Sequence, residues 1–392
     1  MKNLSSLKIV NHHSDHQPLT PWFKITTANA ILCIILALIG LGLVMVYSSS
    51  FLGSEENSKF NDGYFFFKKQ VVWIMLSLLG LFFAQKIPYQ TWRKLDRVIL
   101  VLLFGLLIAV LIPGLGKSFG GARRWFRFGP IGFQPSEFAK IALVIFIAGF
   151  ISRNPERIKD FKKGFLLLSL ILGTVFSLIL MEPDIGTTVF LALVCFLLLF
   201  TGGLKIRHAL PTVLIIGPII FYMAITFFPH VQNRLDAFIN HSAHTRDKGY
   251  QVEQALIGLG AGGLAGAGLG NSVQKLFFLP QEHTDFILAV IGEEAGLLGT
   301  AAIIFLFLAL LWLGYRVFMK TDDLFGKFLA LGITLIITTQ AIMHTAVVTA
   351  SIPNKGISLP FISFGGSAIF MMTLSVGILI NIAKQSEKTV SS

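Results

Sequence analysis

Residues 280–294 read P-Q-E-H-T-D-F-I-L-A-V-I-G-E-E, and this stretch joins a polar turn directly to a strongly apolar run. Asp285 stands where the apolar run begins, and Glu293 and Glu294 follow inside it. An ionisable group at the centre of a membrane helix costs about 2.5–3.5 kcal/mol on insertion scales. We therefore expect at least one of these carboxylates to have a function. The two glutamates also fit a simpler interpretation, in which they pair with Lys or Arg or are protonated within the helix.

The rest of the chain is dominated by apolar runs of the same kind. Of its 392 residues, 54% are hydrophobic and 13% are charged, and the mean hydropathy is +0.75. The runs are about 20 residues long, which is the length that a helix needs to cross the hydrocarbon of a bilayer. They lack the alternation of barrel strands, so we predict an all-α integral membrane protein. The net charge of +12 lies in short loops between the runs, and we predict no nucleic-acid partner.

The apolar runs predict about ten transmembrane helices in a single membrane domain, residues 27–383. Residues 1–26 and 384–392 are predicted to be cytoplasmic tails, the first of them disordered, and 229–284 a large extracytoplasmic loop between spans seven and eight. The predicted spans are 27–48, 69–85, 98–113, 136–152, 164–181, 187–203, 208–228, 285–314, 327–349 and 361–383.

The distribution of Lys and Arg predicts how the chain is oriented. If the N-terminus is inside, the inner segments carry 19 basic residues and the outer segments 12, of which 4 lie in the longest loop. The positive-inside rule therefore favours cytoplasmic positions for both termini. In this orientation the segments rich in charge, Gly and Pro all lie on the outer face, which predicts one composite site there: 116–140, 182–186, 229–284 and 353–367.

Several basic residues of the outer segments are candidates for binding an anion. Arg123 and Arg124 oppose the positive-inside tendency, and the planar guanidinium suits phosphate, although anchoring to lipid head groups is the alternative. Glu137 and Lys140 share a helix face at i, i+3, which predicts either a self-neutralising ion pair or an ammonium group added to the same phosphate site. Lys355 is the only charge in its loop, and a ligand contact is plausible.

Two further segments of the outer face have competing interpretations. Asp184 follows Glu182 and Pro183, and we predict that it caps the sixth span. Residues 256–270 contain seven glycines, too many for a stable lone helix, because each interior Gly costs about 1 kcal/mol relative to Ala. This segment is either a flexible cover over a lipid-bound substrate or a tightly packed structural loop.

Six short motifs follow one another along the chain: G-A-R-R-W (121–125), F-Q-P-S-E-F-A-K (133–140), E-P-D-I-G-T-T (182–188), G-L-G-N-S (268–272), L-P-Q-E-H-T-D-F-I-L-A-V-I-G-E-E-A-G (279–296) and K-G-I-S-L-P-F-I-S-F-G-G-S (355–367). Taken together, they resemble the SEDS family (shape, elongation, division and sporulation), whose members are ten-span glycosyltransferases that polymerise lipid II. Each motif alone is short, but all six occur in the family order. Further short segments are more similar to the division branch than to the elongation branch.

The resemblance implies an inverting displacement on an undecaprenyl-diphosphate-linked donor, with Asp285 as the general base. It implies a diphosphate held by basic residues, for which we name Arg123, Arg124, Lys140 and Lys355. The matched motifs add four substrate-binding candidates: Glu137, His283, Thr284 and Ser363. A divalent cation, Mg²⁺ or Mn²⁺, would fit at the diphosphate, but no metal-ligand cluster is evident in the sequence, and we predict no metal ligands.

The resemblance also implies partners and a location. The partners are lipid II, a class B penicillin-binding protein with transpeptidase activity, and other membrane proteins of the division complex. The location is the bacterial cytoplasmic membrane, at the division septum. Two alternatives are a lipid II flippase and a non-catalytic scaffold for cell-wall enzymes. A transporter would place its charges near the midplane and on both sides of it, whereas the outer face holds them here.

Overall fold

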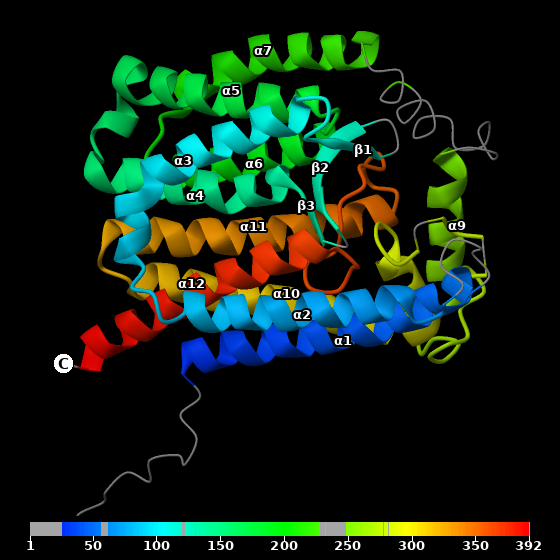
Figure 1. The fold of residues 1–392 in the computed structure, drawn as a ribbon. Coiled ribbons are helices and arrows are strands. Elements are labelled where there is room, and N and C mark those ends of the chain that lie inside the picture. The colour runs from blue at the N-terminus through cyan, green and yellow to red at the C-terminus, as the bar shows by residue number, and fades with distance from the viewer. Residues whose placement is uncertain are drawn as a thin grey trace, which may run out of the picture.

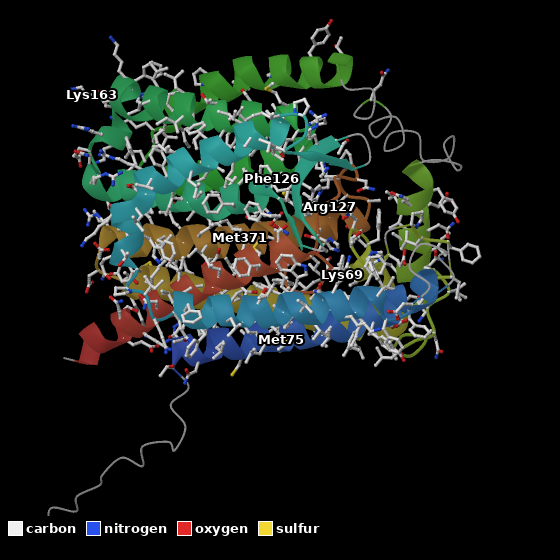
Figure 2. All side chains as sticks on the ribbon, in the orientation of Figure 1. Lys69, Met75, Phe126, Arg127, Lys163 and Met371 are labelled. Carbon is white, nitrogen blue, oxygen red and sulfur yellow. The ribbon has the colours of Figure 1, made fainter. Side chains whose placement is uncertain are left out.

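The computed structural model describes residues 26–55, 62–119, 122–129, 131–227, 232, 248–276, 278–280 and 282–391. Within them, one long helix coincides with each of the ten predicted spans (Figure 1). Seven candidate spans are long and apolar enough to cross a membrane, and α6 is a shorter apolar helix. The ten helices are α1 (Thr27–Glu55), α2 (Phe65–Ala84), α3 (Gln90–Leu111), α4 (Pro135–Arg153), α5 (Leu167–Met181), α6 (Ile185–Thr201), α7 (Ile206–Phe227), α10 (Ile287–Lys320), α11 (Leu324–Val348) and α12 (Gly366–Ser391).

The helices form one bundle whose two ends differ (Figure 1). One end carries a small β-sheet, the extra helix α9 (Lys248–Ala261) and the loop between α11 and α12. The opposite end carries the start of α1 and the end of α12, where Thr27 N donates a hydrogen bond to Glu387 Oε1 at 2.7 Å. The described parts of the predicted composite site therefore lie at a single end of the bundle, away from both ends of the described chain. The predicted tail over residues 1–25, and most of residues 229–247 of the predicted large loop, lie outside the described residues.

Helix α4 lies in the centre of the bundle, where it packs against α3, α6 and α11. It starts at Pro135, a residue that suits the first turn of a helix because its missing N–H has no partner there. Almost all of its residues are buried, including Glu137 and Lys140. Two charged residues of the sequence thus lie inside the protein, and the core must supply their partners.

A three-stranded antiparallel sheet packs against α3 and α4 at this end of the bundle, where the sequence predicted no strand. Its strands are β1 (Lys117–Phe119), β2 (Ala122–Phe128) and β3 (Ile131–Phe133). Ala122 and Phe126 of β2 are buried, so one face of the sheet closes the end of the bundle. The all-α class is confirmed for the membrane helices, and the sheet is an addition confined to one loop.

The glycine-rich segment is a packed structural element. Its first part, to Ala261, belongs to helix α9, which packs against α10 and is therefore not a lone helix. Its second part lies on α10, where Ala267 N donates to Glu293 O at 2.9 Å and Leu297 N donates to Gly263 O at 2.9 Å. Helix α10 is interrupted at Gly296 (φ +66°), where a Cβ would lie 2.6 Å from Leu264 O. Tertiary contacts with α10 thus outweigh the low helix propensity of the glycines.

Candidate functional site

Asp285 lies in the turn that leads into α10, and its side chain is half-buried. The carboxylate lies against Gly356 in the loop between α11 and α12, because a Cβ at Gly356 would come within 3.3 Å of Asp285 Oδ2. Gly356 has φ +63°, a backbone conformation that side-chain-bearing residues rarely adopt. Glycine therefore suits this position for two reasons: the positive φ, and the close approach of the Asp285 carboxylate. Two of the outer segments that the sequence analysis singled out meet at this contact.

The first turn of α6, which belongs to a third predicted outer segment, contacts Lys355. A Cβ at Gly186, in the first turn of α6, would lie 2.7 Å from Lys355 O and 3.3 Å from Lys355 Cβ. Burial lowers the pKa of the half-buried Lys355 ammonium. None of the ion pairs between described residues involves Lys355. A cation without a described carboxylate partner thus adjoins the contact between Gly356 and Asp285.

The predicted substrate residues His283, Thr284 and Ser363 lie together beside Asp285. Ser363 Oγ donates to Thr284 O at 2.7 Å and accepts from Leu359 N at 2.8 Å. Phe364 N donates to His283 O at 2.9 Å. These bonds tie the turn before α10 to the loop before α12. The Ser363 hydroxyl is therefore engaged in holding the site together.

The imidazole of His283 packs against two phenylalanine rings, which also contact each other. Its ring centroid lies 4.3 Å from that of Phe66 in α2 and 5.8 Å from that of Phe364. Its Nδ1 lies 3.5 Å from Glu282 Oε1. Ring packing against two aromatic side chains fixes the orientation of His283, so its backbone and ring both contribute to the shape of the turn.

The two arginines of β2 bind backbone carbonyl groups. Arg124 Nε donates to Glu182 O at 2.7 Å, and its Nη2 donates to Pro183 O. Arg123 Nη1 donates to Leu111 O at 3.1 Å. Asp184 caps α6 as predicted, accepting from Thr187 N at 3.1 Å. The planar guanidinium of Arg124 therefore links the sheet to the turn between α5 and α6.

Lys140 points into the core and donates all three of its ammonium hydrogens to described acceptors. Its Nζ lies 2.7 Å and 2.8 Å from the two carboxylate oxygens of Glu137, and 2.8 Å from Gln340 Oε1 in α11. The predicted ion pair between Glu137 and Lys140 is present. Since an ammonium group has three donors, this arrangement leaves none for a phosphate.

Glu182 is a buried carboxyl group that the sequence analysis noted but did not rank as a site residue. Its side chain is fully buried, and neither carboxyl oxygen has a hydrogen-bond partner in the described part of the chain. Burial, and then the nearby charge of Asp184, raises its pKa to about 8, against the opposing effect of Arg124. Near neutral pH the carboxyl is therefore largely protonated. The sequence signal was present, since a Glu beside an apolar run is costly when charged.

The two glutamates of α10 are structural. Glu294 forms an ion pair with Lys275 at 3.0 Å and accepts from Ser48 Oγ of α1 at 2.7 Å. Glu293 accepts from the backbone N–H of Val273 at 2.9 Å and from Ser272 Oγ. Pairing with a basic residue, expected from the sequence, is thus present for Glu294. Both carboxylates fasten residues 272–275 to α10.

The described residues contain no group of three or more His, Cys, Asp or Glu side chains that could hold a metal ion. They therefore do not fit a divalent cation held by protein ligands alone.

The fold and this end of the bundle define a class of protein: a multi-span helical membrane protein with a polar, loop-built site at one end of its helices. The FtsW/RodA/SpoVE family of cell cycle proteins matches residues 29–388, and the chain belongs to this family.

Relatives and solved structures show what the chain is similar to. It is 38% identical to "Stage V sporulation protein E" of Bacillus subtilis over 93% of this chain and 99% of that protein. It is 39% identical to "Probable peptidoglycan glycosyltransferase FtsW" of Trichlorobacter lovleyi over 90% of this chain and 92% of that protein. A chain of a peptidoglycan synthase complex has the same fold, with TM-score 0.73 and 22% identity over 91% of this chain and 97% of that chain. The two relatives are almost equally similar to this chain.

Proposed function

We propose that this chain is a peptidoglycan glycosyltransferase that polymerises lipid II into β-1,4-linked glycan at the outer face of the bacterial cytoplasmic membrane. The observation that carries the proposal is the junction at Asp285. There a half-buried carboxylate of the α10 turn meets Gly356, next to Lys355 and the first turn of α6. Relatives that bear the name peptidoglycan glycosyltransferase cover most of the chain and support it.

In the proposed reaction, the 4-hydroxyl of the acceptor sugar attacks the anomeric carbon of the donor. The new C–O bond forms as the bond from the anomeric carbon to the diphosphate oxygen breaks, and undecaprenyl diphosphate leaves with the bonding electron pair. Asp285 accepts the proton of the attacking hydroxyl. A positioned general base of this kind contributes about 10²–10⁴-fold to the rate.

The departing diphosphate requires cationic stabilisation, and Lys355 is the candidate that the geometry favours. It is half-buried, it adjoins the contact with Asp285, and no described carboxylate neutralises it. Lys140 and Arg124 were equal candidates in the sequence, but their donors are engaged by Glu137, Gln340 and backbone carbonyl groups. We accordingly place these two residues, with Arg123 and Glu137, in the framework of the site.

The proposal includes an orientation and partners. Both termini lie in the cytoplasm, and the end that carries the β-sheet faces outward, as the excess of basic residues in the opposite loops suggests. The protein acts with a class B penicillin-binding protein and other membrane proteins of the division complex, at the septum.

The test uses the full-length chain, purified in detergent with its transpeptidase partner and supplied with labelled lipid II. We expect polymer from the wild type and a loss of at least about 100-fold in rate for Asp285→Asn, because the amide cannot accept the proton. Asp322→Asn is the matched control. Asp322 is an exposed residue in the loop between α10 and α11. This loop lies at the end of the bundle opposite to the β-sheet (Figure 1).

Each outcome decides between the hypotheses. Normal polymerisation by Asp285→Asn refutes the assignment of the base. A wild type that makes no polymer but moves labelled lipid II across a vesicle membrane supports the flippase. A wild type that does neither, while still binding the transpeptidase, supports the scaffold.

A further inference from the structure

We infer that Gln340 and His344 of α11 are positioning residues, which hold the loop of Lys355 and Gly356 in register with Asp285. The inference rests on the proposed function for its kinetic consequence. Its structural part, the placement of the loop by these two side chains, stands independently of the reaction.

The two side chains bind consecutive carbonyl groups of the loop. His344 Nδ1 lies 2.7 Å from Ile357 O, and Gln340 Nε2 donates to Ser358 O at 2.9 Å. Both side chains are buried, and they lie four residues apart, so they share one face of α11. The carbonyl groups that they bind follow immediately after Gly356, whose Cα faces the carboxylate of Asp285.

The hydrogen-bond partner of His344 determines which ring nitrogen carries the proton. Because a carbonyl oxygen only accepts, Nδ1 of His344 must carry the proton, and the imidazole is the Nδ1–H tautomer if it is neutral. Its Nε2 is buried and has no hydrogen-bond partner in the described part of the chain. The ring therefore makes one described hydrogen bond, and that bond is to the loop.

The buried ion pair of α4 fixes the orientation of the Gln340 amide. Lys140 Nζ has only donors and lies 2.8 Å from Gln340 Oε1, so the amide oxygen must face Lys140. The amide nitrogen is then directed at Ser358. Glu137 holds Lys140 with both of its carboxylate oxygens. A chain of contacts thus runs from Glu137 through Lys140 and Gln340 to the loop.

The loop of Lys355 and Gly356 also packs against α6, on the side away from Ile357 and Ser358. Gly186 accommodates the backbone of Lys355, and a Cβ there would lie 2.7 Å from Lys355 O. The loop is therefore held between α6 on one side and α11 on the other. A displacement at residues 357–358 would carry Gly356 away from Asp285, and misplacement by about 1 Å can cost about 100-fold in rate.

The chain offers a matched pair of substitutions. In Asn, Nδ2 is attached to Cγ, as Nδ1 is in His, so His344→Asn keeps a donor near the same place. In Gln, the nitrogen lies one carbon further out, so His344→Gln keeps an amide but moves the donor. Gln340→Glu is a second, independent variant, because a carboxylate retains the contact with Lys140 but cannot donate to Ser358 O.

We test the kinetic consequence with the full-length protein, its transpeptidase partner and lipid II. His344→Gln and Gln340→Glu should each lower kcat at least about tenfold, as expected for loss of one buried hydrogen bond, with KM little changed. His344→Asn should stay within about threefold of the wild type. In a background of Lys355→Met, His344→Gln should cost less than about twofold, because both substitutions then affect the same contact.

Two kinetic results would overturn the inference. One is equal impairment of His344→Asn and His344→Gln. The other is a full loss from His344→Gln when Lys355 is already Met, since a role in general stability would be additive.

A second measurement tests the placement of the loop separately from the proposed function, and it is informative even if the wild type does not polymerise lipid II. Hydrogen–deuterium exchange of the backbone amides in residues 355–359 should be at least about tenfold faster in His344→Gln than in the wild type or His344→Asn. Exchange within α11 should not change. Equal exchange of the loop in all three proteins would refute the placement of the loop by His344.

Discussion

The buried carboxyl group of Glu182 should make the stability of the protein depend on pH. Its carboxyl group is fully buried without a described hydrogen-bond partner, and its pKa is raised to about 8, mainly by burial and then by the charge of Asp184. We predict that Glu182→Gln removes a pH dependence of stability that the wild type has. The amide resembles the protonated acid in shape and cannot ionise.

The sign and size follow from proton linkage. The folded protein binds the Glu182 proton more tightly than the unfolded chain does, where the pKa is close to 4.5. This contribution is fully present below pH 4.5, declines as the pH rises, and is lost once the pH exceeds about 8. Because one pKa unit corresponds to about 1.4 kcal/mol, the total is roughly 5 kcal/mol. For a chain of this size, 1 kcal/mol moves Tm by up to about 2 °C, so a decline of up to about 10 °C is expected.

The assay is thermal unfolding of wild type and Glu182→Gln in the same detergent at a series of pH values. The difference between the two proteins removes the contribution of titrating groups that do not interact with Glu182. We expect the two Tm values to agree near pH 5 and the variant to become progressively more stable toward pH 9. A difference that is constant with pH, or that grows as the pH falls, would refute the burial of a protonated Glu182.

Two further predictions concern the framework of the site. Gly356→Ala places a Cβ 3.3 Å from Asp285 Oδ2 in a left-handed conformation that costs about 1–2 kcal/mol, and we expect a loss of at least about tenfold in kcat. Gly129→Ala has nearly the same φ (+61°) with no neighbour within 4 Å, so equal polymerisation losses in the two variants would mean that strain alone is responsible. Arg124→Lys keeps the charge but not the fork that binds two carbonyl groups, so we expect about 1–3 kcal/mol lower stability, seen as a lower Tm. Wild-type stability together with weaker binding of lipid II would return Arg124 to a role at the diphosphate.

The membrane architecture could be predicted from the sequence because the signal is long and repeated. A run of about 20 apolar residues has few alternatives to a spanning helix, and each of the ten predicted spans has its helix. The three-stranded sheet was missed because its strands contain only three to seven residues. Such short segments depend on pairing with one another, and neither length nor periodicity identifies them in isolation.

The convergence of the outer segments could also be predicted, but the role of each charged residue could not. Arg124 and Lys355 look alike in the sequence, as basic residues in outer loops. What distinguishes them is the presence of carbonyl groups within reach of Arg124 and their absence from the described contacts of Lys355. That difference depends on the packing of α5, α6 and the sheet, which no local pattern encodes. Gln340 and His344 did leave a signal, two polar residues four apart in an apolar span, which usually indicates a functional or structural contact.

The ion pairs inside the bundle indicate which lysine is available to an anionic ligand. A buried cation is tolerated when a carboxylate lies beside it, and Lys140 pairs with Glu137 at 2.7 Å while Lys275 pairs with Glu294 at 3.0 Å. These pairs neutralise themselves and have no need of a ligand. Lys355 differs, because burial disfavours its charge and no described carboxylate restores it. An anionic ligand would supply the missing partner, so the cost of burying Lys355 is itself an argument for a diphosphate at this end of the bundle.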